Sequence, residues 1–177
     1  IIDTDGLTLI DAGLPGSHKK ILEYMARLTY APKGLKRIII THADFAADLA
    51  PLVGLRAGQG WSVMVVDVQD IFDEYNYGHV SPYPIRDFLA GAAAVWTTAP
   101  SHVLLVGDAS FDPHDYMGFG YYDFVPTKLV DAVFMETASD DWFADVDGDG
   151  TAELAIGRFP VRTAAQTAAV VAKLVAR

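Results

Sequence analysis

Cysteine is absent from the 177 residues, and its absence excludes several kinds of site. Without a thiol the chain has no disulfide, no thiolate metal site and no cysteine nucleophile. Positive charge is also scarce, with 13 Lys and Arg against 23 Asp and Glu and a net charge of −10. Nucleic acids and anionic membranes are bound by clustered positive charge, so neither partner is expected. No apolar run approaches the roughly 18 residues of a membrane span.

Apolar residues, in contrast, are abundant. Hydrophobic residues make up 51% of the chain and charged residues 20%, which is typical of a folded domain rather than a disordered segment. A length of 177 residues corresponds to one domain, or to one domain plus a fragment. The chain begins Ile1-Ile2 with no Met and no visible signal peptide, so we expect it to be a piece of a longer protein.

Short apolar runs alternate with segments of helical periodicity. Strands are predicted at residues 37–41, 61–66, 102–107 and 153–157, with a further short strand at 7–11. Helices are predicted from Ser17, over residues 45–55 with a break at Pro51, over 81–96, and from the N-cap Thr163 onward. Residues 108–126 contain Gly, Pro, Asp and Tyr without periodicity, which predicts a long loop.

This alternation predicts an α/β fold with three layers, α/β/α, around a mainly parallel sheet. In such folds the functional loops lie at the carboxyl ends of the strands. The residues expected at those ends are His42, Asp67, Asp108 and Arg158.

An acidic turn, DVDGDG at residues 145–150, follows the pattern D-x-D-x-D-G. Alternate carboxylates in a glycine-rich turn converge on a hard cation such as calcium, which takes 6–8 oxygen ligands. An EF-hand loop has Glu at its twelfth position, where this chain has Ile156. We therefore predict a structural calcium site of a different type, and the alternative is a solvated acidic turn. The predicted ligands are Asp145, Asp147, Asp149 and Glu153.

From residue 36 onward the order of motifs resembles the gingipain-like cysteine peptidases, a caspase-related α/β family. Four segments of this chain show the resemblance. They are RIIITHADFAADLAPLVGLRAGQGWSVMVVDVQDIFDEYNYG, SPYPIRDFL, HVLLVGDASFDPHDY and TASDDWFADVDGDGTAELAIGRFPVRT.

The resemblance implies that residues 36–177 form the first subdomain of an incomplete catalytic domain. The family's catalytic pair is a His in a Gly-His-Gly segment and a later Cys, and none of the five His lies in such a segment. No catalytic residue is therefore assigned, and the piece is predicted to be inactive alone. The resemblance also implies a second subdomain as partner, peptides as substrates of the complete enzyme, and an extracellular or cell-surface location. Asp140, the acid of the Ser139-Asp140 pair, matches a residue that contributes to a pocket for a basic P1 side chain.

The first 42 residues resemble the start of a metallo-β-lactamase-fold hydrolase, through DTDGLTLIDAGLPGSHKKILEYMARL and KRIIITHAD. This resemblance assigns residues 1–35 to an N-terminal strand–helix segment. His42 matches the first zinc ligand, but Asp44 replaces the second His, and Ala46 and Ala47 replace the following Asp and His. Methyl groups cannot coordinate zinc, so no zinc site is predicted. A natural fusion, a misassembled gene or a chimera would each join these two pieces.

Three functions remain open from the sequence. The first is the non-nucleophilic subdomain of a secreted gingipain-like endopeptidase, supplying scaffold, calcium turn and part of the substrate pocket. The second is a metallo-β-lactamase-like hydrolase fragment that has lost zinc ligands. The third is a non-catalytic calcium-binding α/β module. If the chain is such a peptidase subdomain, the aromatic residues of the long loop are expected to anchor that loop, to cover a peptide groove or to contact the missing subdomain. They are Phe119, Tyr121, Tyr122 and Phe124.

Overall fold

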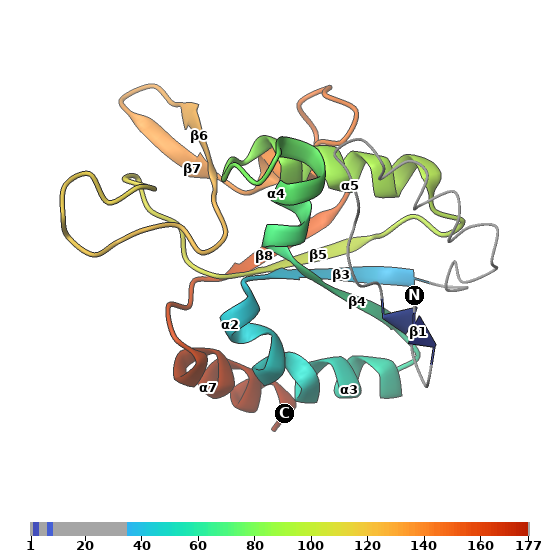
Figure 1. Cartoon of the computed structure of the whole chain (residues 1–177). Coiled ribbons are helices and arrows are strands. Elements are labelled where there is room, and N and C mark those ends of the chain that lie inside the picture. The colour runs from blue at the N-terminus through green and yellow to red at the C-terminus, as the bar shows by residue number, and fades with distance from the viewer. Residues whose placement is uncertain (1, 4–6, 9–34, 177) are drawn as a thin grey trace.

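The computed structural model describes residues 2–3, 7–8 and 35–176 (Figure 1). Its main sheet contains β3 (Leu35–Thr41), β4 (Ser62–Asp67), β5 (His102–Val106) and β8 (Ala155–Phe159). The strand order is β4-β3-β5-β8 and every pairing is parallel. Two short strands, β1 (Ile2–Asp3) and β2 (Leu7–Thr8), pair antiparallel with each other. The predicted α/β fold with a mainly parallel sheet is confirmed.

Helices cover both faces of the sheet, as Figure 1 shows. One face carries α2 (Ala43–Ala46), the 3₁₀ turn η1 (Ala47–Leu49), α3 (Ala50–Gly58) and α7 (Ala164–Val175). The other face carries α4 (Val68–Asn76), α5 (Tyr83–Val95) and α6 (Asp141–Ala144). None of the helices in the described part of the chain combines the length and apolarity needed to cross a bilayer.

The central strand β3 shows why this sequence forms a covered sheet. Successive side chains of a strand point to opposite faces, so a continuous apolar run can be buried on both. Ile38 and Ile40 belong to the core beneath α4 and α5, while Ile39 belongs to the core beneath α3 and α7. All three isoleucines are at most 3% exposed.

Local capping fixes where several helices begin. His42, Asp67 and Thr163 each accept a hydrogen bond from a backbone N–H of the first turn that follows, in α2, α4 and α7 respectively. The cap predicted at Thr163 is confirmed. Pro51 lies in the first turn of α3, where its missing N–H is not needed, so the predicted break is also confirmed.

The structure corrects the last predicted strand, which runs over Ala155–Phe159 rather than 153–157. Arg158 therefore lies within the strand instead of following it. The shift arises because Glu153 belongs to the acidic turn, where its Oε2 accepts a hydrogen bond from the Val146 N–H at 2.8 Å.

The elements that were not predicted include the helices α4 and α6 and the antiparallel hairpin of β6 (Lys128–Asp131) and β7 (Glu136–Ser139). The helix predicted from Ser17 and residues 9–11 of the short predicted strand lie outside the described residues. The division of the chain at residues 35 and 36 stays a prediction.

Candidate functional site

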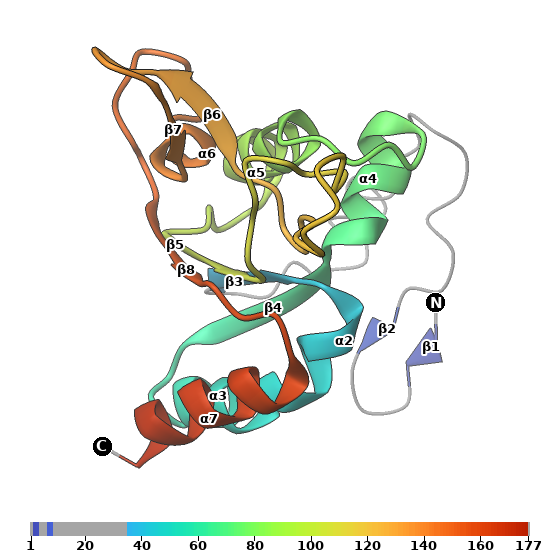
Figure 2. The same ribbon diagram turned by 90° about the vertical axis from the view of Figure 1, so that its left-hand side faces the viewer.

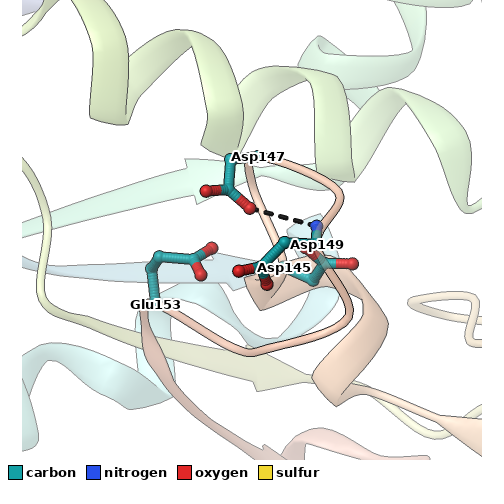
Figure 3. Close-up of side chains that lie close together, drawn as sticks. All are labelled: Asp145, Asp147, Asp149 and Glu153. Atoms are coloured by element: carbon teal, nitrogen blue, oxygen red, sulfur yellow. Dashed lines mark hydrogen bonds between the residues drawn. The ribbon is translucent and has the colours of Figure 1, made fainter.

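The acidic turn brings its predicted ligands together. One carboxylate oxygen from each of Asp145, Asp147, Asp149 and Glu153 lies within 4.8 Å of the others. The turn follows α6 and leads into β8, and Figure 3 shows the four side chains grouped around it. Gly148 and Gly150 have φ of 84° and 90°, a backbone region that side-chain-bearing residues rarely adopt, so these glycines permit the tight turn.

Backbone hydrogen bonds hold these carboxylates in place. Oδ1 of Asp145 accepts from the Gly148 N–H at 2.8 Å, and Oδ1 of Asp147 accepts from the Asp149 N–H at 3.1 Å (Figure 3). Oδ1 of Asp149 accepts from the Thr151 N–H at 2.8 Å. Each of these aspartates thus uses one oxygen for the backbone, and for Asp147 and Asp149 the second oxygen remains available to a ligand.

Among the residues that the structure describes, one cation from outside the turn reaches this cluster. Arg86 of α5 donates from Nε to the Asp145 carbonyl at 2.8 Å, and its Nη2 lies 3.3 Å from Asp145 Oδ2. A single guanidinium leaves most of the negative charge of four carboxylates uncompensated. The cluster could hold a metal ion, and because every side-chain donor is oxygen, it fits a hard cation such as calcium better than zinc.

Asp140 lies beside the sheet rather than in the acidic cluster. Its carboxylate accepts from Arg158 Nε at 2.8 Å and Nη2 at 2.7 Å, and from the Thr127 hydroxyl at 3.0 Å. Arg158 also donates to the carbonyls of Gly107, Val125 and Pro126. The Arg158 and Asp140 side chains are 12% and 25% exposed, so this bidentate pair is largely shielded from water. Sequence reasoning did not identify this partner of Asp140.

A second ion pair holds the long loop at the same end of the sheet. Arg162 Nη1 lies 3.1 Å from Asp108 Oδ2. The Arg162 guanidinium also lies over the rings of Tyr121, Tyr122 and Phe124, at 5.0, 5.7 and 5.3 Å from their centroids. These three aromatics anchor the loop to the segment after β8, which was one of the roles expected for them.

Within the loop, acidic side chains organise the backbone. Asp112 is buried and accepts from the N–H groups of Tyr116 and Met117 at 2.9 and 2.7 Å. Asp123 accepts from the Ser110 N–H, and burial raises the pKa of the Asp123 carboxyl above its usual range.

The remaining residues expected at the strand ends serve as helix caps. His42 Nδ1 accepts from the Asp44 N–H at 3.2 Å and lies 3.6 Å from the Asp44 carboxylate. Asp67 Oδ1 accepts from the Gln69 N–H at 3.0 Å. Of the four side chains predicted at this edge, two therefore cap helices and two, Asp108 and Arg158, form ion pairs.

Comparison with family models confirms both resemblances found in the sequence. Residues 30–177 match the model of peptidase family C25, and residues 1–45 match the model of the metallo-beta-lactamase superfamily. A search of curated proteins found no match.

Solved structures with a similar fold include dimeric latent PorU from Porphyromonas gingivalis, with a TM-score of 0.65 and 24% identity over 78% of this chain. The Arg-specific cysteine proteinase gingipain R (RGPB) gives a TM-score of 0.61 and 20% identity over 79% of this chain. A structure described as a protease gives a TM-score of 0.63 and 17% identity over 80%. The matched part spans only 15%, 28% and 27% of those chains, respectively.

Proposed function

Because the chain belongs to peptidase family C25, we propose that it forms the non-nucleophilic first subdomain of a secreted or cell-surface gingipain-like cysteine endopeptidase. It supplies the scaffold, a calcium-binding turn and part of the substrate pocket. With no Cys among its 177 residues, the thiol nucleophile comes from another part of the complete enzyme, and this piece is inactive alone. The observation that carries the proposal is the cluster of ion-paired loops at the carboxyl edge of the sheet, where open α/β sheets bind ligands.

The surface at this edge supports docking of the second subdomain. The long loop and the β6–β7 hairpin both extend from this end of the sheet in Figure 1, and the hairpin stands clear of the sheet in Figure 2. At the hairpin tip Val133 and Phe134 are 91% and 95% exposed, and the loop exposes Phe111, Tyr116 and Phe119. We propose that these exposed apolar side chains, on two segments that project from the same end of the sheet, contact the second subdomain. We therefore expect the isolated chain to self-associate, and a clean monomer over a wide concentration range in sizing experiments would count against a missing partner.

Asp140 is proposed to contribute to the pocket for a basic P1 side chain. A substrate guanidinium would share its carboxylate with Arg158, since two oxygens offer about four acceptor sites and Arg158 and Thr127 use three of them. Peptides containing Arg or Lys are expected to bind weakly and to remain uncleaved by the chain alone. Turnover of such peptides that is abolished by Asp140→Asn would overturn the proposed inactivity.

The calcium turn is tested by thermal unfolding with calcium, with EDTA and with zinc. Calcium is expected to raise the unfolding temperature because it binds the folded state alone. Asp147→Asn removes one charged ligand of the cluster and should weaken the calcium response. Asp131→Asn, which removes an exposed carboxylate of the hairpin, is the matched control and should keep it.

The three metal conditions separate the competing functions. A calcium response that survives Asp147→Asn unchanged would argue against a site in this turn. Stoichiometric zinc binding would instead support the metallo-β-lactamase reading of residues 1–45. Reading the gene past Arg177 separates a peptidase subdomain from a non-catalytic calcium module, since only the former requires a Gly-His-Gly segment and a later Cys.

A further inference from the structure

A groove of about 380 Å³ lies at the amino end of the sheet, the opposite end from the ion-paired loops. Its floor consists of two rows of residues that neighbour one another across β3, β5 and β8. The rows are Arg37, His102 and Ala155, and then Ile39, Leu104 and Gly157. Its walls are Leu52 and Arg56 of α3 and Leu174 of α7. The groove is thus mostly apolar, with basic groups along one side.

Small residues on β8 keep the groove open. Ala155 and Gly157 offer at most a methyl group to this face of the strand. A Cβ added at Gly157 would meet no atom within 4 Å, and the residue lies outside the left-handed region of backbone conformation. A larger side chain at Gly157 would therefore extend into the groove without backbone strain.

The two arginines of the groove have no acidic partner in the part of the chain that the structure describes. The Arg37 guanidinium lies 3.8 Å from the centroid of the Trp61 ring, and its Nε is buried without a hydrogen-bond partner. Arg56 donates only to the side-chain oxygen of Gln59, at 2.8 Å. Burial, followed by the positive charge of Arg56, lowers the pKa of Arg37. Among the described residues that line the groove there is no Asp or Glu, although the chain carries a net charge of −10.

These features define the chemistry of a ligand. Stacking on Trp61 occupies a face of the Arg37 guanidinium, so its N–H groups remain free to donate in the plane. A carboxylate accepts such bonds in a charge-assisted manner and would offset the repulsion between the two arginines. The apolar floor and walls would remove a hydrocarbon chain from water.

We propose that this groove binds a small amphipathic carboxylate, with its charged end at Arg37 and Arg56 and its hydrocarbon over Leu104 and Gly157. The site is independent of the peptidase function proposed above, because it lies at the other end of the sheet and shares no residue with the acidic turn or with Asp140.

Octanoate is the probe, titrated into the whole 177-residue chain by calorimetry. We expect saturable one-to-one binding. Octan-1-ol, which has the same chain but no charge, should bind about tenfold more weakly or worse, because it forms no charge-assisted hydrogen bond. Hexanoate should also bind about tenfold more weakly, because two methylene groups fewer leave water. Absence of saturation, or equal affinity for octanoate and octan-1-ol, would overturn the proposal.

Substitutions then locate the ligand. Arg37→Gln and Arg56→Gln should each weaken octanoate binding about tenfold, and Gly157→Leu should abolish it by filling the groove while leaving both arginines in place. Lys173→Gln, which removes one exposed positive charge of α7 outside the groove lining, is the matched control and should bind normally. Thermal unfolding checks whether each variant is folded. If one arginine variant is unfolded, the other arginine variant and Gly157→Leu still test whether octanoate binds in the groove. Wild-type affinity in Gly157→Leu, or equal weakening by Lys173→Gln and Arg56→Gln, would place octanoate elsewhere and overturn the proposal.

Discussion

At the carboxyl end of the sheet Arg158 and Arg162 each contact a carboxylate, whereas at the amino end neither Arg37 nor Arg56 contacts one among the residues that the structure describes. The two ion pairs join segments that are distant in sequence, from Asp140 to Arg158 and from Asp108 to Arg162. They hold the long loop of residues 108–126, which has few backbone hydrogen bonds of the strand-pairing kind. At the amino end, the pairings of β3 with β5 and of β5 with β8 begin directly in the strand ladder.

This difference distinguishes arginines that stabilise the fold from arginines whose charge is available to a ligand. A guanidinium that already donates to a carboxylate and to several carbonyls serves the fold, and its loss exposes unpaired acceptors. A guanidinium with an unused buried donor gives the fold little and is available to a ligand. Four substitutions test this division, using the free energy of unfolding from urea denaturation as the common measurement.

The largest effect is expected for Arg158→Met. The methionine fits a similar volume, but it leaves three carbonyls without the guanidinium and leaves the Asp140 carboxylate with the Thr127 hydroxyl but without its cation. The free energy of unfolding should therefore fall by about 3 kcal/mol. Arg158→Lys keeps the charge but not the planar bidentate geometry and should lose an intermediate amount. A loss of only a few tenths of a kcal/mol would mean that water replaces this pair readily.

Arg162→Met should have a moderate effect of about 1 kcal/mol, because this ion pair is more exposed and its ring contacts are partly retained by a methionine. Its specific consequence is loosening of residues 108–126. Limited digestion with chymotrypsin should cut this loop sooner in the variant than in the wild type. An unchanged cleavage rate would show that the aromatic residues hold the loop without the arginine.

Asp123→Asn should have a smaller, pH-dependent effect. Burial raises the folded-state pKa of Asp123, so the folded chain binds more protons than the unfolded chain, and stability falls as pH rises between the unfolded and folded pKa values. The asparagine keeps an acceptor for the Ser110 N–H without the buried charge. The variant should therefore be the more stable at pH 7, with the difference vanishing below about pH 4. Asp131→Asn is the control, because it removes one exposed negative charge. A loss of stability at pH 7 in Asp123→Asn would contradict a destabilising role of the buried Asp123 charge.

Arg37→Met should have the smallest effect, within about 0.5 kcal/mol of the wild type in either direction. Removing this partly buried cation relieves its repulsion with the like-charged Arg56, which favours the folded state. This gain offsets the loss of stacking on Trp61. The same replacement is thus expected to be strongly destabilising at one end of the sheet and nearly neutral at the other. A loss as large as that of Arg158→Met would reveal that Arg37 has a structural role.

Much of this fold follows from local patterns that a sequence shows directly. The β-branched run at Ile38–Ile40 indicates a strand covered on both faces, and Thr163 marks the start of the last helix. The acidic turn was predictable because its ligands are close in sequence and its glycines permit the turn.

The missed elements have identifiable reasons. The helix α4 was not predicted because its segment contains several acidic residues. Asp67 is nevertheless a good N-cap, and apolar residues recur at helical spacing, namely Val68, Ile71 and Phe72. In the hairpin β6–β7 the second strand has mostly exposed side chains, so no buried alternation marks it. The pair of Arg158 and Asp140 depends on the sheet bringing β8 beside the loop, which no local pattern encodes.

Three of the four methionines lie in the part of the chain that the structure describes. Met117 in the long loop and Met135 at the hairpin tip are 56% and 72% exposed, whereas Met64 lies in the sheet. Peroxide converts an accessible thioether to its sulfoxide first, so the mass gained by peptides containing Met117 and Met135 measures the accessibility of those two places. Oxidation that slows at both when a further polypeptide is added would map its footprint without any label on the protein.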